Sequence, residues 1–366
     1  MASKKNSPKE ERNSKPERGR LKAVDEVRLE MKLGKQGREI KRLRAKHNAA
    51  LALLYEAETA NEALLGLQSK CDTFKISPKT STGESEATAV MVASDWHVEE
   101  RVKPSTINMK NRFDLDLAKV RANQFFQNGL RLVEIMRQAT TVKTLVLALL
   151  GDFITNDIHE ELVELNQLPP MDAAIYARDL IASGIEFLLK RGNFDEIVIP
   201  CHSGNHGRTT KKVQVSTERG HSLEYFMFDS LARHFKDEPR VKFVVAEGYH
   251  SYLQVHGMTI RFHHGHEIRY QGGVGGIFIP ANKAIAQWNK VQWADLDVFG
   301  HFHQMKDGGN FVSNGSLIGF NAYALSIKAD SEHPKQACFL LDRKRGRTIT
   351  APIVFDDTKK DGPKAA

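Results

Sequence analysis

The stretch AVMVASDWH, residues 89–97, places Asp95 and His97 directly after a run of apolar residues. The stretch TLVLALLGD, residues 144–152, ends in the same way, with Asp152 after a Gly. Short runs that are apolar throughout are typical of strands buried on both faces. Ligands of open α/β sheets bind beyond the carboxyl ends of the strands, so these polar side chains are expected to share one site.

Three further predicted strands also end in polar residues. EIVIP (196–200) precedes Gly204-Asn205-His206, TIRF (259–262) precedes His263-His264-Gly265-His266, and DVF (297–299) precedes Gly300-His301-Phe302-His303. Any one of these steps could be an ordinary turn, but five of them at strand ends point to one site. His301 and His303 would face opposite ways on an extended chain, so using both requires a bend, which Gly300 permits.

The other apolar patterns predict a layered domain. Helices are expected over 115–138, 172–190, 223–234 and 281–290, a strand over 241–246, and hairpins over 252–262 and 338–355. Helices that alternate with strands, followed mainly by strands, predict an α/β or α+β fold.

The net charge of +8 is concentrated at the start of the chain. Residues 1–50 contain 16 Lys or Arg and 7 Asp or Glu, whereas the remaining residues are nearly balanced. A basic segment on a near-neutral body is typical of an arm that contacts a polyanion or docks on a protein. Nucleic acid is therefore one expected partner.

Composition divides the chain into five expected parts. These are a disordered basic tail (1–19), a basic helical extension (20–71), a linker (72–87), the main domain (88–356) and a frayed tail (357–366). The helical extension could bind DNA, pair with a second copy as an irregular coiled coil, or dock a partner protein.

The cysteines and the hydropathy indicate a reducing compartment and no membrane partner. Cys71, Cys201 and Cys338 suggest neither a disulfide framework nor a zinc site. The longest apolar run, 145–150, is too short to cross a bilayer, and the first residues lack a secretory signal. We therefore expect a cytoplasmic protein, in the host cytoplasm if the gene is viral.

The expected ligand types suit two divalent cations. Neutral imidazoles and carboxylates bind manganese, which we expect first, and also iron, zinc or nickel. One shared carboxylate can bridge two cations about 3.5–4 Å apart and so hold a hydroxide between them. Such a centre matches the hydrolysis of a phosphoester, whose developing charge the cations neutralise.

Over residues 88–355, the ordered set of motifs resembles the calcineurin-like metallophosphoesterase superfamily. The stretch Asn314-Gly315-Ser316-Leu317 is similar to the DNA-repair-exonuclease and phage-encoded branches. The resemblance implies a four-layer α-β-β-α sandwich, which here would carry an N-terminal helical extension.

The resemblance also implies a role for each matching residue. Asp95, His97 and His303 would hold one metal; Asn205, His264 and His301 would hold the other; Asp152 would bridge them. His206 would contact the phosphate and protonate the leaving oxygen. His264 is preferred to His266 because the family ligand comes first in the His-Gly-His step. His266 and Arg208 remain candidates for substrate binding, although Arg208 could equally be an exposed loop residue.

Two positions depart from the family pattern. Thr155 stands where the family often has Asp, and Gly207 stands where it often has an acid that supports the catalytic histidine. The support of His206 is therefore open. A glycine-rich stretch, residues 272–276, could be a mobile gate over the site.

The resulting hypothesis is a nuclease or phosphodiesterase that acts on nucleic acid. One alternative is a phosphomonoesterase or protein phosphatase with the same site. A second is a non-catalytic nucleic-acid-binding scaffold.

Overall fold

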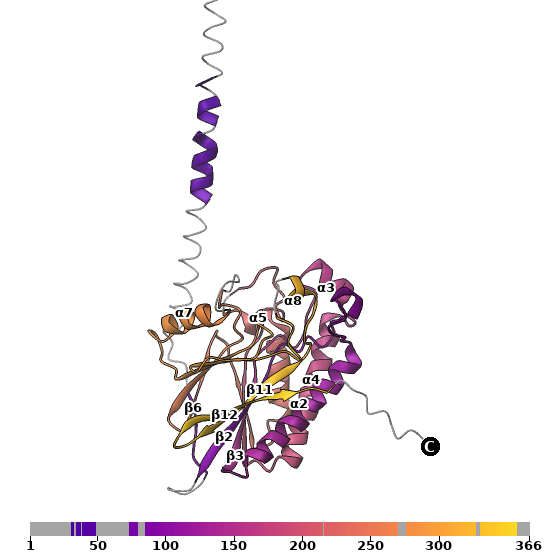
Figure 1. The fold of residues 1–366 in the computed structure, drawn as a ribbon, viewed down its shortest axis with the longest axis vertical. Helices are drawn as coiled ribbons and strands as arrows, with labels where there is room; N and C mark the ends of the chain where they lie inside the picture. The colour runs from indigo at the N-terminus through magenta and orange to yellow at the C-terminus, as the bar shows by residue number, and fades with distance from the viewer. Residues whose placement is uncertain are drawn as a thin grey trace, which may run out of the picture. The chain divides into compact units, whose positions relative to one another are not determined.

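The computed structural model describes residues 31–48 except 33 and 38, 73–79, 85–269 except 215, 276–326, and 330–356. The chain divides into two compact units, residues 1–65 and 66–366. In the first unit, the described residues are helical and exposed. All the described strands lie in the second unit (Figure 1).

The second unit is built on two six-stranded sheets. Sheet A has the order β1 (Phe74–Ile76), β6 (Ser251–Val255), β7 (Met258–Phe262), β8 (Leu296–Phe299), β10 (Phe311–Ser313) and β9 (Lys306–Asp307). Sheet B has the order β12 (Gly346–Val354), β11 (Lys335–Asp342), β2 (Glu86–Ala93), β3 (Thr141–Leu149), β4 (Glu196–Cys201) and β5 (Val241–Val245). Strands β2 to β5 run parallel, as do β7, β8 and β10.

Both faces of sheet B are covered at its central strands, which explains the apolar stretches 89–93 and 145–149. In β2, Val90 and Val92 belong to the core between the two sheets, while Ala89 and Met91 belong to the core under the helices. Three helices contribute to that second core: α2 (Leu115–Met136), α4 (Pro170–Arg191) and α6 (Leu223–His234). Alternate side chains of a strand point to opposite faces, so a strand with two dry faces must be apolar throughout.

Among the described helices, α7 (Phe278–Trp288) is the one that packs on the outer face of sheet A. Helix α7 buries Ala281 and Ile285 against Phe299 and Phe311. Figure 1 shows α7 on one side of the sheets and α2 and α4 on the other. The layers are therefore helices, sheet B, sheet A and helix, which confirms the predicted four-layer sandwich.

The structure corrects the predicted linker. Within the stretch 72–87, β1 pairs in parallel with β6, and β2 already begins at Glu86. Composition alone could not show this pairing, because a three-residue edge strand is too short to produce a periodic pattern. The main domain thus begins before residue 88.

Other elements confirm a prediction or were not predicted. The hairpin predicted over 252–262 is present and turns at His256-Gly257, where both residues have positive φ (50° and 88°). Short helices α3 (Glu160–Leu165), α5 (Glu218–His221) and α8 (Ala322–Ser326) and the 3-10 turn Pro104–Thr106 were not predicted.

Several expectations fall on parts of the chain without a description. The tails 1–19 and 357–366, Cys71 and most of the glycine-rich stretch lie outside the described residues. Among the helices that are described, none combines the length and apolarity needed to cross a bilayer.

Candidate metal centre

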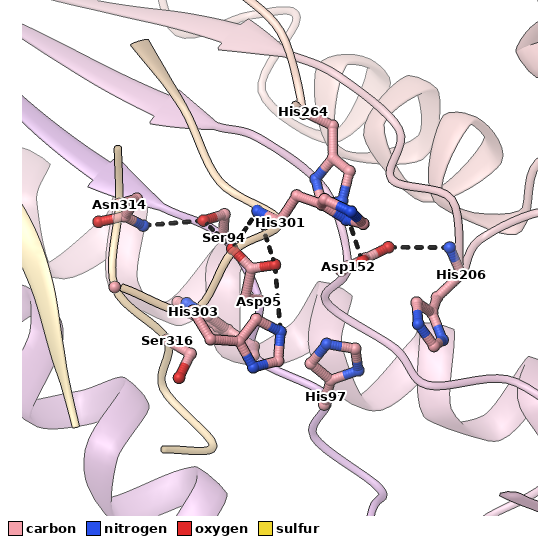
Figure 2. A network of polar contacts seen from close by, with 12 residues as sticks. Ser94, Asp95, His97, Asp152, His206, His264, His301, His303, Asn314 and Ser316 are labelled. Atoms are coloured by element: carbon pink, nitrogen blue, oxygen red, sulfur yellow. Dashed lines mark hydrogen bonds and ion pairs between the residues drawn. The ribbon is translucent and has the colours of Figure 1, made fainter. Parts of the chain in front are cut away.

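The five polar strand ends converge on one space. They follow β2, β3 and β4 of sheet B and β7 and β8 of sheet A. Figure 2 shows Asp95, Asp152, His264 and His303 directed toward a common centre. The loops are joined by backbone hydrogen bonds, such as that from the Asp95 N–H to the Gly151 carbonyl (2.9 Å).

The convergent side chains form three groups in which the potential ligand atoms lie within 4.8 Å of one another. The groups are Asp95, His97 and His303; His97, Asp152 and His206; and Asp152, His264 and His301. The first group contains the three residues predicted to hold one metal. The third contains the two histidines predicted to hold the other, without Asn205. Asp152 belongs to the second and third groups. The structure therefore brings together the carboxylates and imidazoles that the sequence singled out.

The backbone at these residues is bent in an unusual way. Asp95, His97, Asp152, His301 and His303 all have positive φ, between 47° and 70°. A left-handed conformation costs a non-glycine residue roughly 1–2 kcal/mol, and such strain persists where the surroundings enforce it. The bend that allows both histidines of the Gly-His-x-His motif to face the centre lies in those histidines themselves.

Glycines make room for the close approach of the loops. A Cβ on Gly300 would lie 2.5 Å from Asp95 Oδ2, so that residue provides space; the prediction that it provides the bend was wrong. A Cβ on Gly204 would overlap Asp152 Oδ1. Any side chain at these two positions would displace a carboxylate of the centre.

The Asp95 carboxylate accepts from a hydroxyl and from a backbone N–H. The Ser94 hydroxyl donates to Asp95 Oδ2 (2.5 Å), and the His301 N–H lies 3.0 Å from both carboxylate oxygens. Asn314 in turn donates to the Ser94 hydroxyl (2.8 Å), as Figure 2 shows. The Asn-Gly-Ser-Leu stretch thus supports the site through its asparagine.

His264 bonds to a backbone carbonyl through one ring nitrogen and faces the Asp152 carboxylate with the other. Its Nδ1–H donates to the Leu150 carbonyl (2.6 Å), and its Nε2 lies 3.0 Å from Asp152 Oδ2. Burial alone would lower the pKa of His264, but the carboxylate of Asp152 outweighs burial and raises it to about 9. A positive charge, carried by a proton or a cation, is therefore favoured between these two atoms.

His97 is hydrogen-bonded through Nδ1, and its Nε2 has no partner among the described residues. Its Nδ1 lies 3.0 Å from the Thr155 hydroxyl, which also approaches Glu100 Oε2 (3.4 Å). Burial, together with the neighbouring His206 and His303 rings, keeps the pKa of His97 well below its ordinary value, so it is neutral. A neutral imidazole is the form that binds a metal.

Two buried atoms at the centre lack a hydrogen-bond partner within the described part of the chain and could instead bind a cation. His97 Nε2 and Asn205 Oδ1 have no hydrogen-bond partner among the described residues. Buried polar atoms are rarely left without a partner, and unsatisfied ones mark functional sites or bound ions. Both residues are predicted ligands, one for each metal, so the chemistry of the centre fits a pair of divalent cations.

His206 is oriented by the loop that contains Thr155. Its Nδ1–H donates to the Thr155 carbonyl (2.8 Å), and its backbone N–H donates to Asp152 Oδ1 (2.8 Å). A carbonyl can only accept, which fixes the tautomer and leaves Nε2 for a substrate or an ion.

A pocket lies beside the centre and contains both predicted substrate-binding residues. Its walls are Gly204, Asn205, Arg208, Thr210, Val213, Gln214, Thr217, Glu218, His221, Ser222 and His266. Arg208 donates to the Asn205 carbonyl and keeps a buried Nε without a partner among the described residues. His266 is outside all three ligand groups. The structure thus places Arg208 and His266 at a wall of the pocket.

Other residues support the site without belonging to it. His263 lies 3.4 Å from the buried carboxylate of Asp297 and stacks on Phe299. Trp96 is buried, makes edge contacts to Phe125 and two other phenylalanine rings, and donates to Gln336 (3.2 Å). It packs the strand end, so it is not available to stack on a base.

Three buried acids near the site were missed by the sequence analysis. Glu99 accepts from the N–H groups of Thr155 and Asn156 (2.7 and 2.8 Å), and Glu100 accepts from Asn321 (3.0 Å). The third, Glu224, lies on α6. Burial raises the pKa of Glu99 to about 8. Acidic residues in loops or amphipathic helices are ordinarily exposed, so only the fold reveals these.

No protein-family model matches the chain, and the comparison with curated proteins finds no match. Several solved structures are similar. A hypothetical protein from Pyrococcus horikoshii is 12% identical with a TM-score of 0.38, covering 74% of this chain and 89% of its own. Vps29 from Chaetomium thermophilum is 10% identical with a TM-score of 0.27, covering 72% and 94%. A protein serine/threonine phosphatase from Saccharomyces cerevisiae is 9% identical with a TM-score of 0.30, covering 84% and 91%. Because these TM-scores lie below 0.5, we take the function from the geometry of the site alone.

Proposed function

We propose that this chain is a two-metal phosphoester hydrolase of the calcineurin-like metallophosphoesterase type. The observation that carries the proposal is the carboxylate of Asp152, which lies within 4.8 Å of a ring nitrogen of His97 on one side and of His264 and His301 on the other. A shared carboxylate between two sets of nitrogen ligands is the arrangement that two-metal hydrolytic sites require.

In this proposal, Asp95, His97 and His303 would hold one cation, Asn205, His264 and His301 would hold the other, and Asp152 would be shared by both. The cations, when bound, would neutralise the phosphate oxygens and activate water at neutral pH. Manganese is our first choice because mixed carboxylate and imidazole ligands suit it, with iron, zinc or nickel as alternatives.

The protein's own groups would bind and protonate the substrate. His206 presents Nε2 to the site because its Nδ1–H is donated to the Thr155 carbonyl (2.8 Å). When the ring is also protonated at Nε2, that N–H can give its proton to the leaving oxygen and leave the ring neutral. Arg208 lines the adjacent pocket and can bind a phosphate oxygen through its free Nε–H.

For the substrate, we propose the phosphodiester bonds of nucleic acid. The support is the basic charge of residues 1–50, whose Lys and Arg can follow a phosphate backbone. Phosphomonoesters and phosphoproteins are the alternative, because the same centre would hydrolyse them.

The substrate can be tested on manganese-loaded protein. Cleavage of labelled single- and double-stranded DNA and RNA is compared with turnover of p-nitrophenyl phosphate and its bis-ester. We expect cleavage of nucleic acid and of the bis-ester. Turnover of the monoester alone would exclude the nuclease, and no turnover by protein that binds two metals would exclude the hydrolase.

The basic arm can be tested on the full chain. Lys41, Arg42, Arg44 and Lys46 are exposed on the helical part of the first unit. If the arm neutralises phosphates, replacing all four by Gln should weaken DNA binding. The slope of log K against log salt should then become shallower by about 0.9 for each phosphate that is no longer neutralised. An unchanged slope would leave pairing with a second copy or docking on a protein as the role of the helix.

A further inference from the structure

Glu224 is a fully buried acid that contacts two loops of the centre at once. It lies in the first turn of α6 and is 0% exposed. Its Oε1 accepts from the Phe153 N–H (2.6 Å) and its Oε2 accepts from the Gly204 N–H (2.6 Å). Phe153 follows the shared ligand Asp152, and Gly204 precedes the proposed amide ligand.

The same carboxylate occupies the space beside Gly207. A Cβ at Gly207 would lie 2.7 Å from Glu224 Cγ and 3.0 Å from its carboxylate carbon. The loop and the helix are also joined by the Leu223 N–H, which donates to the Gly207 carbonyl (2.8 Å). Gly207 is the position where the sequence lacks the acid expected after Gly-Asn-His, and an acid from α6 fills the space there.

A carboxylate suits this position because it has only acceptors. Two N–H groups that converge on one side chain can both be satisfied by its two oxygens. A glutamine of the same shape would have to present an NH₂ group to one of the two N–H groups. Glu224 therefore supplies two acceptor oxygens to two backbone N–H groups, which a glutamine at this position could not do.

We propose that Glu224 is a positioning residue that fixes the Asp152 and Asn205 loops relative to each other, with its carboxylate in the space beside Gly207. Its effect on catalysis rests on the proposed function, whereas its effect on the loops does not. Supporting groups behind metal ligands typically contribute 10–100-fold to metal affinity. We expect an effect of that size here.

The first test is Glu224→Gln in the full chain. Amide hydrogen exchange should become faster in the peptides that contain residues 151–156 and 203–207, with or without metal. Manganese affinity, measured by competition with a chelator, should fall about 10–100-fold. The matched control is Glu196→Gln, a buried acid at the other end of β4 that pairs with Lys242 (2.6 Å), and it should change neither readout.

The second test moves the carboxylate from residue 224 to residue 207. Gly207→Asp alone should weaken manganese binding because the new side chain meets Glu224. In the Glu224→Ala background, the same Gly207→Asp change should restore part of the affinity removed by Glu224→Ala alone, because the carboxylate now enters from the loop. This comparison separates positioning from a general loss of packing.

Two results would overturn the proposal. One is unchanged exchange and unchanged manganese affinity in Glu224→Gln. The other is a double variant that binds manganese no better than Glu224→Ala. If the wild-type chain binds no metal or hydrolyses no phosphoester, the proposed function fails, but the exchange rates of the two loops still decide whether Glu224 fixes them.

Discussion

His264 and Asp152 face each other through His264 Nε2 and Asp152 Oδ2, which lie 3.0 Å apart. The proton of the neutral His264 ring is donated to the Leu150 carbonyl (2.6 Å), so Nε2 would present a lone pair to the carboxylate. Two lone pairs at this distance repel each other unless a proton or a cation lies between them. A cation bound by both residues would resolve the conflict without a protonated histidine.

Replacing Asp152 should weaken both proposed metal sites. In Asp152→Asn, one oxygen becomes an NH₂ group that binds no cation, so we expect the bound metal to fall from two ions per chain to one or none. Elemental analysis of dialysed, manganese-loaded protein measures this. The control Asp157→Asn changes an exposed acid in the same loop and should keep both ions. Two retained ions in Asp152→Asn would refute the bridging role.

Adding metal should stabilise the fold. His97 Nε2 and Asn205 Oδ1 are buried without partners among the described residues, and their ligation removes that cost. At a manganese concentration about 100-fold above Kd, the stabilisation should be roughly 2.7 kcal/mol for one site. Thermal unfolding with manganese and with chelator gives the difference, and His97→Ala should reduce it. Equal melting temperatures in the two conditions would contradict a metal centre.

Replacing His206 should affect the chemical step more than metal binding. In His206→Asn, the leaving oxygen loses its proton donor, so kcat should fall by about 10²–10⁴-fold. The metal content should remain at two ions because the proposed ligands are intact. Substrates with a better leaving group need the proton less and should show a smaller loss. A uniform loss across leaving groups would argue against the role of His206 as an acid.

Thr155 should act through its hydroxyl, which lies 3.0 Å from His97 Nδ1. Thr155→Val keeps the shape of the side chain and removes the hydroxyl that orients the ring, so manganese affinity should fall by about 10–100-fold. Thr155→Ser retains the hydroxyl and should restore most of the affinity. If the valine and serine variants bind manganese equally well, the hydroxyl does not support His97.

Much of the fold was predictable because burial on both faces leaves a clear pattern in sheet B. Residues 89–93 of β2 and 145–149 of β3 are apolar without interruption, and the hairpin at His256-Gly257 contains residues that tolerate positive φ. The edge strand β1 was missed because three residues carry no periodicity. Its pairing with β6 depends on residues about 180 positions away, which no local pattern records.

The sequence by itself determined which polar residues stand at strand ends, and so which imidazoles and carboxylates could meet. The tertiary structure decided how they meet. It bends the chain at His301 and His303 and places a buried acid from α6 against Gly207. The physical reason is that strand ends follow from local hydrophobic patterning, whereas the support of a ligand depends on groups that come close only after the layers pack.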